Sequence, residues 1–103
     1  MLINKMEVKE FQRKIVEFAD KWDRKRNVIP NTHSNFIHLV EEIGELAHEY
    51  VSEEKRKDKF SKEKLENAIG DILLQTVELA HLHGMDIEEL VLKIINDEEQ
   101  RVT

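Results

Sequence analysis

The stretch that decides the fold runs from Glu41 to Glu49 and reads Glu-Glu-Ile-Gly-Glu-Leu-Ala-His-Glu. A helix advances by about 100° per residue, so Glu42, Glu45 and Glu49 fall on one stripe. That stripe adjoins an apolar arc, which consists of Leu39, Val40, Ile43, Leu46, Ala47 and Tyr50. The pattern predicts an amphipathic helix that presents carboxylates at the border of the core.

Asp71 is a further acidic residue, and it lies within an apolar run of a second predicted helix. Asp71 is part of Ile-Gly-Asp-Ile-Leu-Leu at positions 69–74, where a carboxylate without a partner is costly. Acids placed beside a core on two helices suit a hard divalent cation, so the pattern indicates a metal site. The alternative for Asp71 is a buried acid that receives a hydrogen bond from a Lys, Arg or Trp22 donor. For Glu41, Glu49 and Glu53, taken individually, the favoured interpretation is an ordinary solvated helix face.

Length and composition favour one all-α domain over residues 1–103. The chain is 40% hydrophobic and contains one Pro and three Gly. Small helical domains of this kind have modest cores, and we therefore expect a homo-oligomer. A net charge of −6 argues against a nucleic-acid-binding face. It is compatible with a phosphorylated small molecule, because bound Mg²⁺ reverses the local sign of charge.

The sequence also bears on location. It has no cysteine, which excludes disulfides and thiolate metal sites. No apolar run approaches the length that spans a membrane, and Met1–Glu7 lacks the apolar core of a signal peptide. We therefore expect a cytoplasmic protein with no membrane partner.

Periodicity predicts four helices. The first is expected over about Val8–Arg24 and the second over about Asn35–Glu53. The third is expected to begin after Ser61 as N-cap, to end at Gly84 and to be the most buried of the four. Asp86 is expected to cap the fourth. The expected architecture is an antiparallel four-helix bundle.

Three blocks of the sequence resemble one known family. Residues 39–49 resemble the E-E-x-x-E motif of MazG-like nucleotide pyrophosphohydrolases. Residues 68–77 look like the E-x-x-D block of that family with its apolar continuation, and residues 83–89 resemble its turn into the last helix. The resemblance extends over about Phe36–Arg101.

The resemblance implies an all-α, usually oligomeric enzyme that hydrolyses a nucleoside triphosphate to a monophosphate and pyrophosphate. In such enzymes, acids of both motifs hold Mg²⁺, for which Mn²⁺ can substitute, on the triphosphate. Carried over to this chain, the metal ligands are Glu42, Glu45 and Asp71. Glu41 joins them as an assisting catalytic residue. The expected assembly is a homodimer or homotetramer.

The chain departs from the family at one position. Ala68 stands where the E-x-x-D block has its Glu. Asn67, one turn before Asp71, can offer an amide oxygen, and Glu49 or an acid of a partner subunit can fill the gap. The alternative function is therefore a catalytically weakened, nucleotide-binding or helical interaction protein.

Three further residues are candidates for substrate contact. Trp22 can stack on a base while the basic residues at 21 and 24–26 grip phosphates, although its spacing favours a core tryptophan. His38 lies one turn before Glu42 and can contact substrate, or it is a surface histidine. Lys93 is a candidate for phosphate contact.

A rival metal site comes from a repeated tetrapeptide. Glu45–His48 and Glu78–His81 both read Glu-Leu-Ala-His, which fits the Glu-x-x-His pattern of di-iron bundles. Such a site also needs an inward Glu from each of the other two helices, and the apolar face of the first helix shows none. A di-iron carboxylate bundle is therefore the less favoured alternative.

Overall fold

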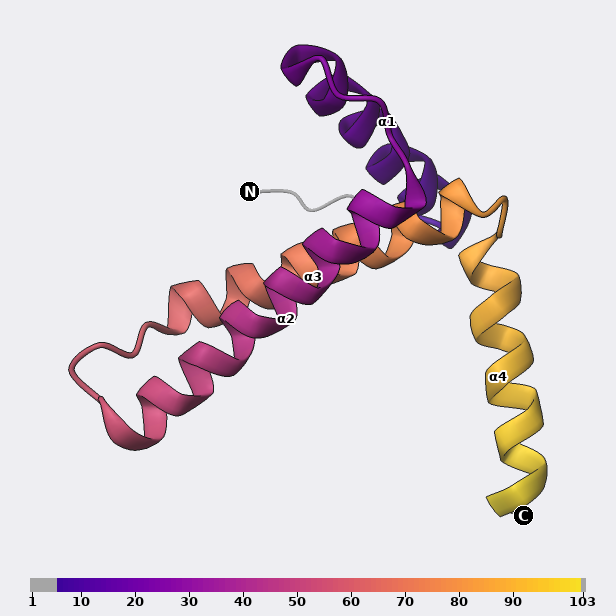
Figure 1. Cartoon of the computed structure of the whole chain (residues 1–103). Coiled ribbons are helices and arrows are strands. Elements are labelled where there is room, and N and C mark those ends of the chain that lie inside the picture. The colour runs from indigo at the N-terminus through magenta and orange to yellow at the C-terminus, as the bar shows by residue number, and fades with distance from the viewer. Residues whose placement is uncertain (1–5, 103) are drawn as a thin grey trace.

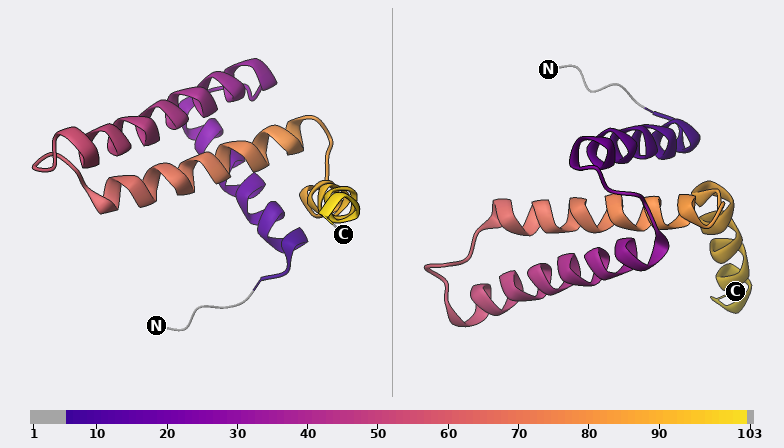
Figure 2. Two further views of the ribbon diagram at one scale, coloured as in Figure 1. Left: turned by 90° about the horizontal axis from the view of Figure 1, so that it is seen from below. Right: turned by 45° about the horizontal axis from the view of Figure 1, so that its top comes forward.

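The structure, a computed structural model that describes residues 6–102, is made of four helices with no strand in that range. The helices are α1 (Val8–Arg26), α2 (Thr32–Lys55), α3 (Lys62–Leu82) and α4 (Ile87–Val102) (Figure 1). The predicted all-α class with four helices is confirmed. α2 and α3 form a long antiparallel pair, α1 crosses this pair at one end, and α4 projects away from it (Figure 2).

Local side-chain chemistry sets the helix ends. The Asn31 side chain accepts a hydrogen bond from the Ser34 backbone N–H at 2.8 Å, so α2 begins three residues earlier than expected. Ser61 caps α3 as predicted and accepts from the Lys64 N–H at 3.2 Å. Gly84 follows that helix with a positive φ of 73°, which glycine adopts without strain. Asp86 Oδ1 accepts from the Glu88 and Glu89 N–H groups at 2.9 and 3.2 Å.

The turn between α3 and α4 is fastened to α1. The Gln12 amide donates to the Met85 carbonyl and accepts from the Ile87 N–H, both at 2.9 Å. Lys9 pairs with Asp86 at 2.8 Å. Because a single side chain satisfies both a donor and an acceptor of this turn, the start of α4 is anchored on α1 rather than on the α2–α3 pair.

α3 is the central helix, but it is less covered than its sequence suggests. It packs along α2 and also contacts α1, and it carries buried Ala68 and Val77. On its uncovered side, Ile69 and Leu73 are 44% and 54% exposed. Asp71 is exposed within this single chain, so the alternative in which it is a buried acid that receives a hydrogen bond is wrong.

None of the helices within residues 6–102 is both long enough and apolar enough to cross a membrane. The expectation about Met1–Glu7 mostly concerns residues 1–5, which lie outside the described part of the chain.

Candidate functional site

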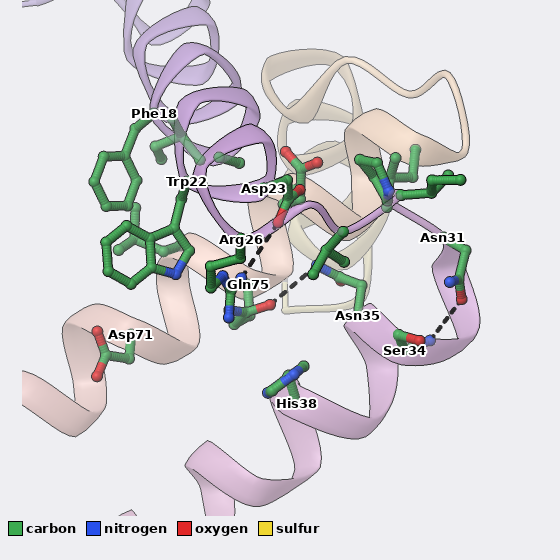
Figure 3. Close-up of a pocket in the computed structure, with 18 of the residues that line it drawn as sticks. Phe18, Trp22, Asp23, Arg26, Asn31, Ser34, Asn35, His38, Asp71 and Gln75 are labelled. Atoms are coloured by element: carbon green, nitrogen blue, oxygen red, sulfur yellow. Dashed lines mark hydrogen bonds and ion pairs between the residues drawn. The ribbon is translucent and has the colours of Figure 1, made fainter.

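A cavity of about 480 Å³ lies where α1, the α1–α2 loop, α2 and α3 meet (Figure 3). Its volume falls within the range of small-molecule sites. One wall is aromatic and apolar, and the rest carries amide, imidazole and carboxyl groups. The lining includes Phe18, Trp22, Asp23, Arg26, Asn35, His38, Glu42, Asp71, Gln75 and Glu78.

Helical spacing places the polar lining. On α2, positions 35, 38 and 42 share a face, and on α3 positions 71, 75 and 78 do so. The Asn35 amide donates to Gln75 Oε1 at 3.0 Å and fixes the register of the two helices (Figure 3). Since the helices are antiparallel, Glu42 and Asp71 lie on one side of this bond, and Glu78 lies on the other. The cavity therefore has two chemically distinct ends.

The first end is acidic and electrostatically crowded. Glu42 is half-buried, and its Oε2 is buried without a hydrogen-bond partner among the described residues. Burial raises the pKa of Glu42 from 4.5 to about 7, and the negative charges of Glu45 and Asp71 add to the rise. Because the charges of Glu45 and Asp71 both act on Glu42, these three carboxyls, predicted as metal ligands, are neighbours. An acid whose pKa is raised toward 7 by burial and by neighbouring negative charges is a frequent mark of a functional site.

The three carboxyls suit a cation in chemistry but are not closed around one. Among the described residues, no three His, Cys, Asp or Glu side chains are grouped tightly enough to hold a metal ion. Carboxylates of like charge repel one another, so an open arrangement is expected when no cation neutralises them. The unpartnered oxygen of Glu42 is the observation that fits an oxygen-loving divalent ion.

The other predicted site residues divide into two groups. Trp22 and His38 line the cavity together with Glu42 and Asp71. Glu41 is exposed and does not line it. Lys93 lies on α4 and pairs with Asp97 at 3.3 Å, so this chain does not bring it to the cavity.

Trp22 is not a core residue in this chain. It is 47% exposed, and its ring stacks on Phe18 with centroids 6.4 Å apart. The Arg26 guanidinium lies 5.2 Å from the centroid of the Trp22 ring and also bonds Asp23. The interpretation that spacing favoured, a tryptophan within the core, is therefore wrong. The ring stands in the cavity wall beside a cation (Figure 3).

Glu49 corrects another expectation. It is 6% exposed rather than solvated, and its Oε1 accepts from the Ser61 backbone N–H at 3.2 Å. Ser61 is the N-cap of α3, and the residue that would normally return a carboxylate to it, three positions on, is Lys64. Glu49 therefore supplies from α2 the acceptor that α3 does not provide for itself.

The two Glu-x-x-His segments do not face one another. From the level of the Asn35–Gln75 bond, Glu45 and Glu78 lie in opposite directions along the pair. The resulting separation is about 20 Å along the helix axes. The di-iron arrangement is therefore not assembled within the described chain.

Sequence reasoning missed the importance of three cavity residues, Asn35, Gln75 and Glu78. A signal was present, since positions 71, 75, 78 and 82 form one stripe of α3 at helical spacing. Glu78 is 6% exposed, and neither of its carboxyl oxygens has a hydrogen-bond partner in the described part of the chain. Burial raises its pKa, nearby Asp20 and Asp23 act in the same direction, and His81 opposes them.

Comparisons with known proteins agree with the geometry. Residues 31–102 match the family model of the MazG nucleotide pyrophosphohydrolase domain. The fold resembles the crystal structure of the Bacillus-conserved MazG protein, a nucleotide pyrophosphohydrolase, with a TM-score of 0.70, 20% identity and 92% of each chain covered. Comparison with curated protein sequences gives no significant match. Because the family model covers α2, α3 and α4 with both acidic blocks, the chain belongs to the MazG nucleotide pyrophosphohydrolase domain family.

Proposed function

We propose that this protein hydrolyses a nucleoside triphosphate to a monophosphate and pyrophosphate in a divalent-metal-dependent reaction. The observation that carries the proposal is the buried, unpartnered oxygen of Glu42 beside Glu45 and Asp71 at one end of a nucleotide-sized cavity. Membership of the MazG family supports the reaction class.

The residues have distinct roles in this proposal. Glu42, Glu45 and Asp71 would hold Mg²⁺, or Mn²⁺ in its place, and Glu41 assists from the adjoining position. The ion supplies neutralisation of phosphate charge and a more acidic water. Trp22 and His38 line the same cavity, where Trp22 offers a ring face to a base and His38 contacts the substrate. The phosphate contact of Lys93 stays a prediction that this cavity does not support, because Lys93 does not line it and pairs with Asp97.

The test is pyrophosphate release from a panel of ribo-, deoxy- and modified nucleoside triphosphates, with Mg²⁺ or Mn²⁺. Wild-type protein is compared with Glu45→Gln and Asp71→Asn. Release that requires the metal and both acids supports the proposal. Release that is equal in wild type and both variants contradicts it.

The second candidate function is a nucleotide-binding or helical interaction protein with weakened catalysis. The observation behind it is Ala68, which is 4% exposed and provides no ligand where the family motif has Glu. Ala68→Glu discriminates between the two. A large gain in metal-dependent hydrolysis marks a weakened enzyme, whereas no gain marks a site remodelled for another use.

We also propose that the chain functions as a homo-oligomer, a dimer or tetramer. Its accessible surface is 8629 Å². A compact protein of its mass exposes about 6,100 Å². Its radius of gyration is 16.4 Å. About 13 Å is expected for a compact domain of this length. The accessible surface therefore exceeds that of a compact protein by about 2,500 Å², an area that matches what one chain buries in an obligate dimer.

A second copy is the occupant that fits the uncovered apolar surface. No residue of α4 between Ile87 and Val102 is buried, and Leu92 and Ile94 are 52% and 59% exposed. Light scattering on the full chain measures the assembly. A mass above that of one chain, reduced by Ile94→Lys but not by the exposed-site control Lys93→Gln, supports the proposal. A monomeric wild type contradicts it.

A further inference from the structure

The end of the cavity opposite Glu42 carries a cluster of hydrogen-bond acceptors that receive no hydrogen bond from the described residues. Within residues 6–102, the buried side-chain polar atoms that lack a partner are Asn35 Oδ1, Glu42 Oε2 and both Glu78 carboxyl oxygens. All are oxygens, and three of them belong to the Asn35–Glu78 end. An unpaired buried polar atom is costly, so a ligand that brings donors to this end is favoured.

The surrounding structure holds these acceptors in place. Asn35 is oriented by its donated bond to Gln75, which leaves its Oδ1 as the free end of the amide. Glu78 is 6% exposed, in contrast to exposed Asp71 on the same stripe, and no cationic side chain within residues 6–102 bonds to it. Its charged neighbours are Asp20 and Asp23, which disfavour an anionic ligand group, and His81.

The distance along α3 suits a nucleotide. Seven residues separate Asp71 from Glu78, which corresponds to about 10 Å along the helix. That separation is comparable to the distance from the triphosphate to the far edge of the base in one nucleotide. A triphosphate placed against Glu42 and Asp71 can therefore direct its base toward Glu78, within the cavity that Trp22 also lines.

We propose that Glu78 and Asn35 form a base-reading subsite that selects nucleotides whose base carries an exocyclic amino group. This inference rests on the proposed hydrolysis and adds its substrate class. An amino group donates to the free oxygens. A keto oxygen in the same place faces acceptors only and leaves them unpaired. The ionised Glu78 carboxylate, like Asn35 Oδ1, offers acceptors only, so the discrimination is a property of the ionised form.

The experiment compares kcat/KM within two matched nucleotide pairs that differ by amino against keto: CTP with UTP, and ATP with ITP. In wild type, the amino member of the pair used best is expected to be favoured by about tenfold or more. In Glu78→Gln, the added amide donor pairs with a keto oxygen, so the ratio falls toward one or inverts. Glu66→Gln on the exposed side of α3 is the matched control and keeps the wild-type ratio.

The readout separates recognition from folding. A purely structural role for Glu78 lowers turnover of both members equally and leaves the ratio unchanged, which overturns the inference. A wild-type preference for keto bases also overturns it. Asn35→Ser, which removes Oδ1, is a second variant and is expected to reduce the ratio by a smaller factor, with circular dichroism verifying the fold of each variant.

Failure of the proposed hydrolysis is distinguishable from failure of this inference. If wild type releases no pyrophosphate, the non-hydrolysable α,β-methylene analogues of CTP and UTP are titrated against Trp22 fluorescence. Tighter binding of the CTP analogue, lost in Glu78→Gln, supports the subsite without the reaction. Equal binding of the two analogues, or binding of neither, overturns the subsite.

Discussion

Glu42 and Glu49 lie two turns apart on the same stripe of α2, but the structure uses them differently. Glu49 is buried, and the Ser61 N–H at the start of α3 satisfies its carboxylate. Glu42 is half-buried beside Glu45 and Asp71, and one of its oxygens has no partner. A carboxylate that caps a helix stabilises the fold. One held among like charges destabilises it, and this pattern is typical of a group that binds a ligand.

The contrast between Glu42 and Glu49 is tested most strongly by removing one of the negative charges beside Glu42. Asp71→Asn or Glu45→Gln is expected to lower metal-dependent pyrophosphate release by about 100-fold or more, because each removes an anionic oxygen that would contact the ion. The same substitutions relieve repulsion at Glu42, so thermal stability without metal should stay level or rise. A loss of activity that merely follows a loss of stability would contradict this division.

The next largest effect is expected at Glu49, which accepts from the backbone N–H at the start of α3. Glu49→Ala is expected to lower the free energy of unfolding by about 1–3 kcal/mol, since it leaves the Ser61 N–H without its acceptor. Glu49→Gln keeps an oxygen for that N–H and should cost less than half as much. Urea denaturation measures both. Glu42→Ala is the matched control on the same stripe. If it lowered the free energy of unfolding as much as Glu49→Ala does, Glu49 would have no special role in stability compared with Glu42.

Local chemistry made much of the fold predictable. Ser61, Gly84 and Asp86 set their helix ends through caps and a positive φ that act within a few residues. The carboxylate stripe on α2 was predictable because it depends only on helical periodicity, and the position of Glu42 at the edge of the core followed from it. These features require no knowledge of which helix packs where.

The features that sequence did not predict depend on tertiary placement. Glu49 is buried because the α2–α3 loop returns Ser61 to it, which helical periodicity alone does not show. Trp22 continues an apolar stripe, yet α1 crosses the α2–α3 pair and leaves the ring in a cavity wall. Glu78 looked like part of a Glu-x-x-His pattern. Its acceptor role emerges only when Asn35 is seen across the cavity.

The smallest expected effect is a pH dependence of stability specific to Glu42. Its pKa is about 7 in the fold against an ordinary 4.5, so between these values the folded chain holds a proton that the unfolded chain has lost. Stability from this group is therefore full below about pH 4.5, falls as pH rises toward 7 and levels off above it. Since the side chain is only half-buried, the change is on the order of 1 kcal/mol.

Glu42→Gln removes this titration, so the difference in unfolding free energy between variant and wild type should grow in favour of the variant from pH 5 to pH 8. Denaturation in metal-free buffer at several pH values measures it, with Glu41→Gln as the exposed neighbouring control. A difference that is constant with pH would show that Glu42 titrates normally. In that case the contrast with Glu49 would rest on hydrogen bonding alone, and the crowding of Glu42 by Glu45 and Asp71 would play no part in it.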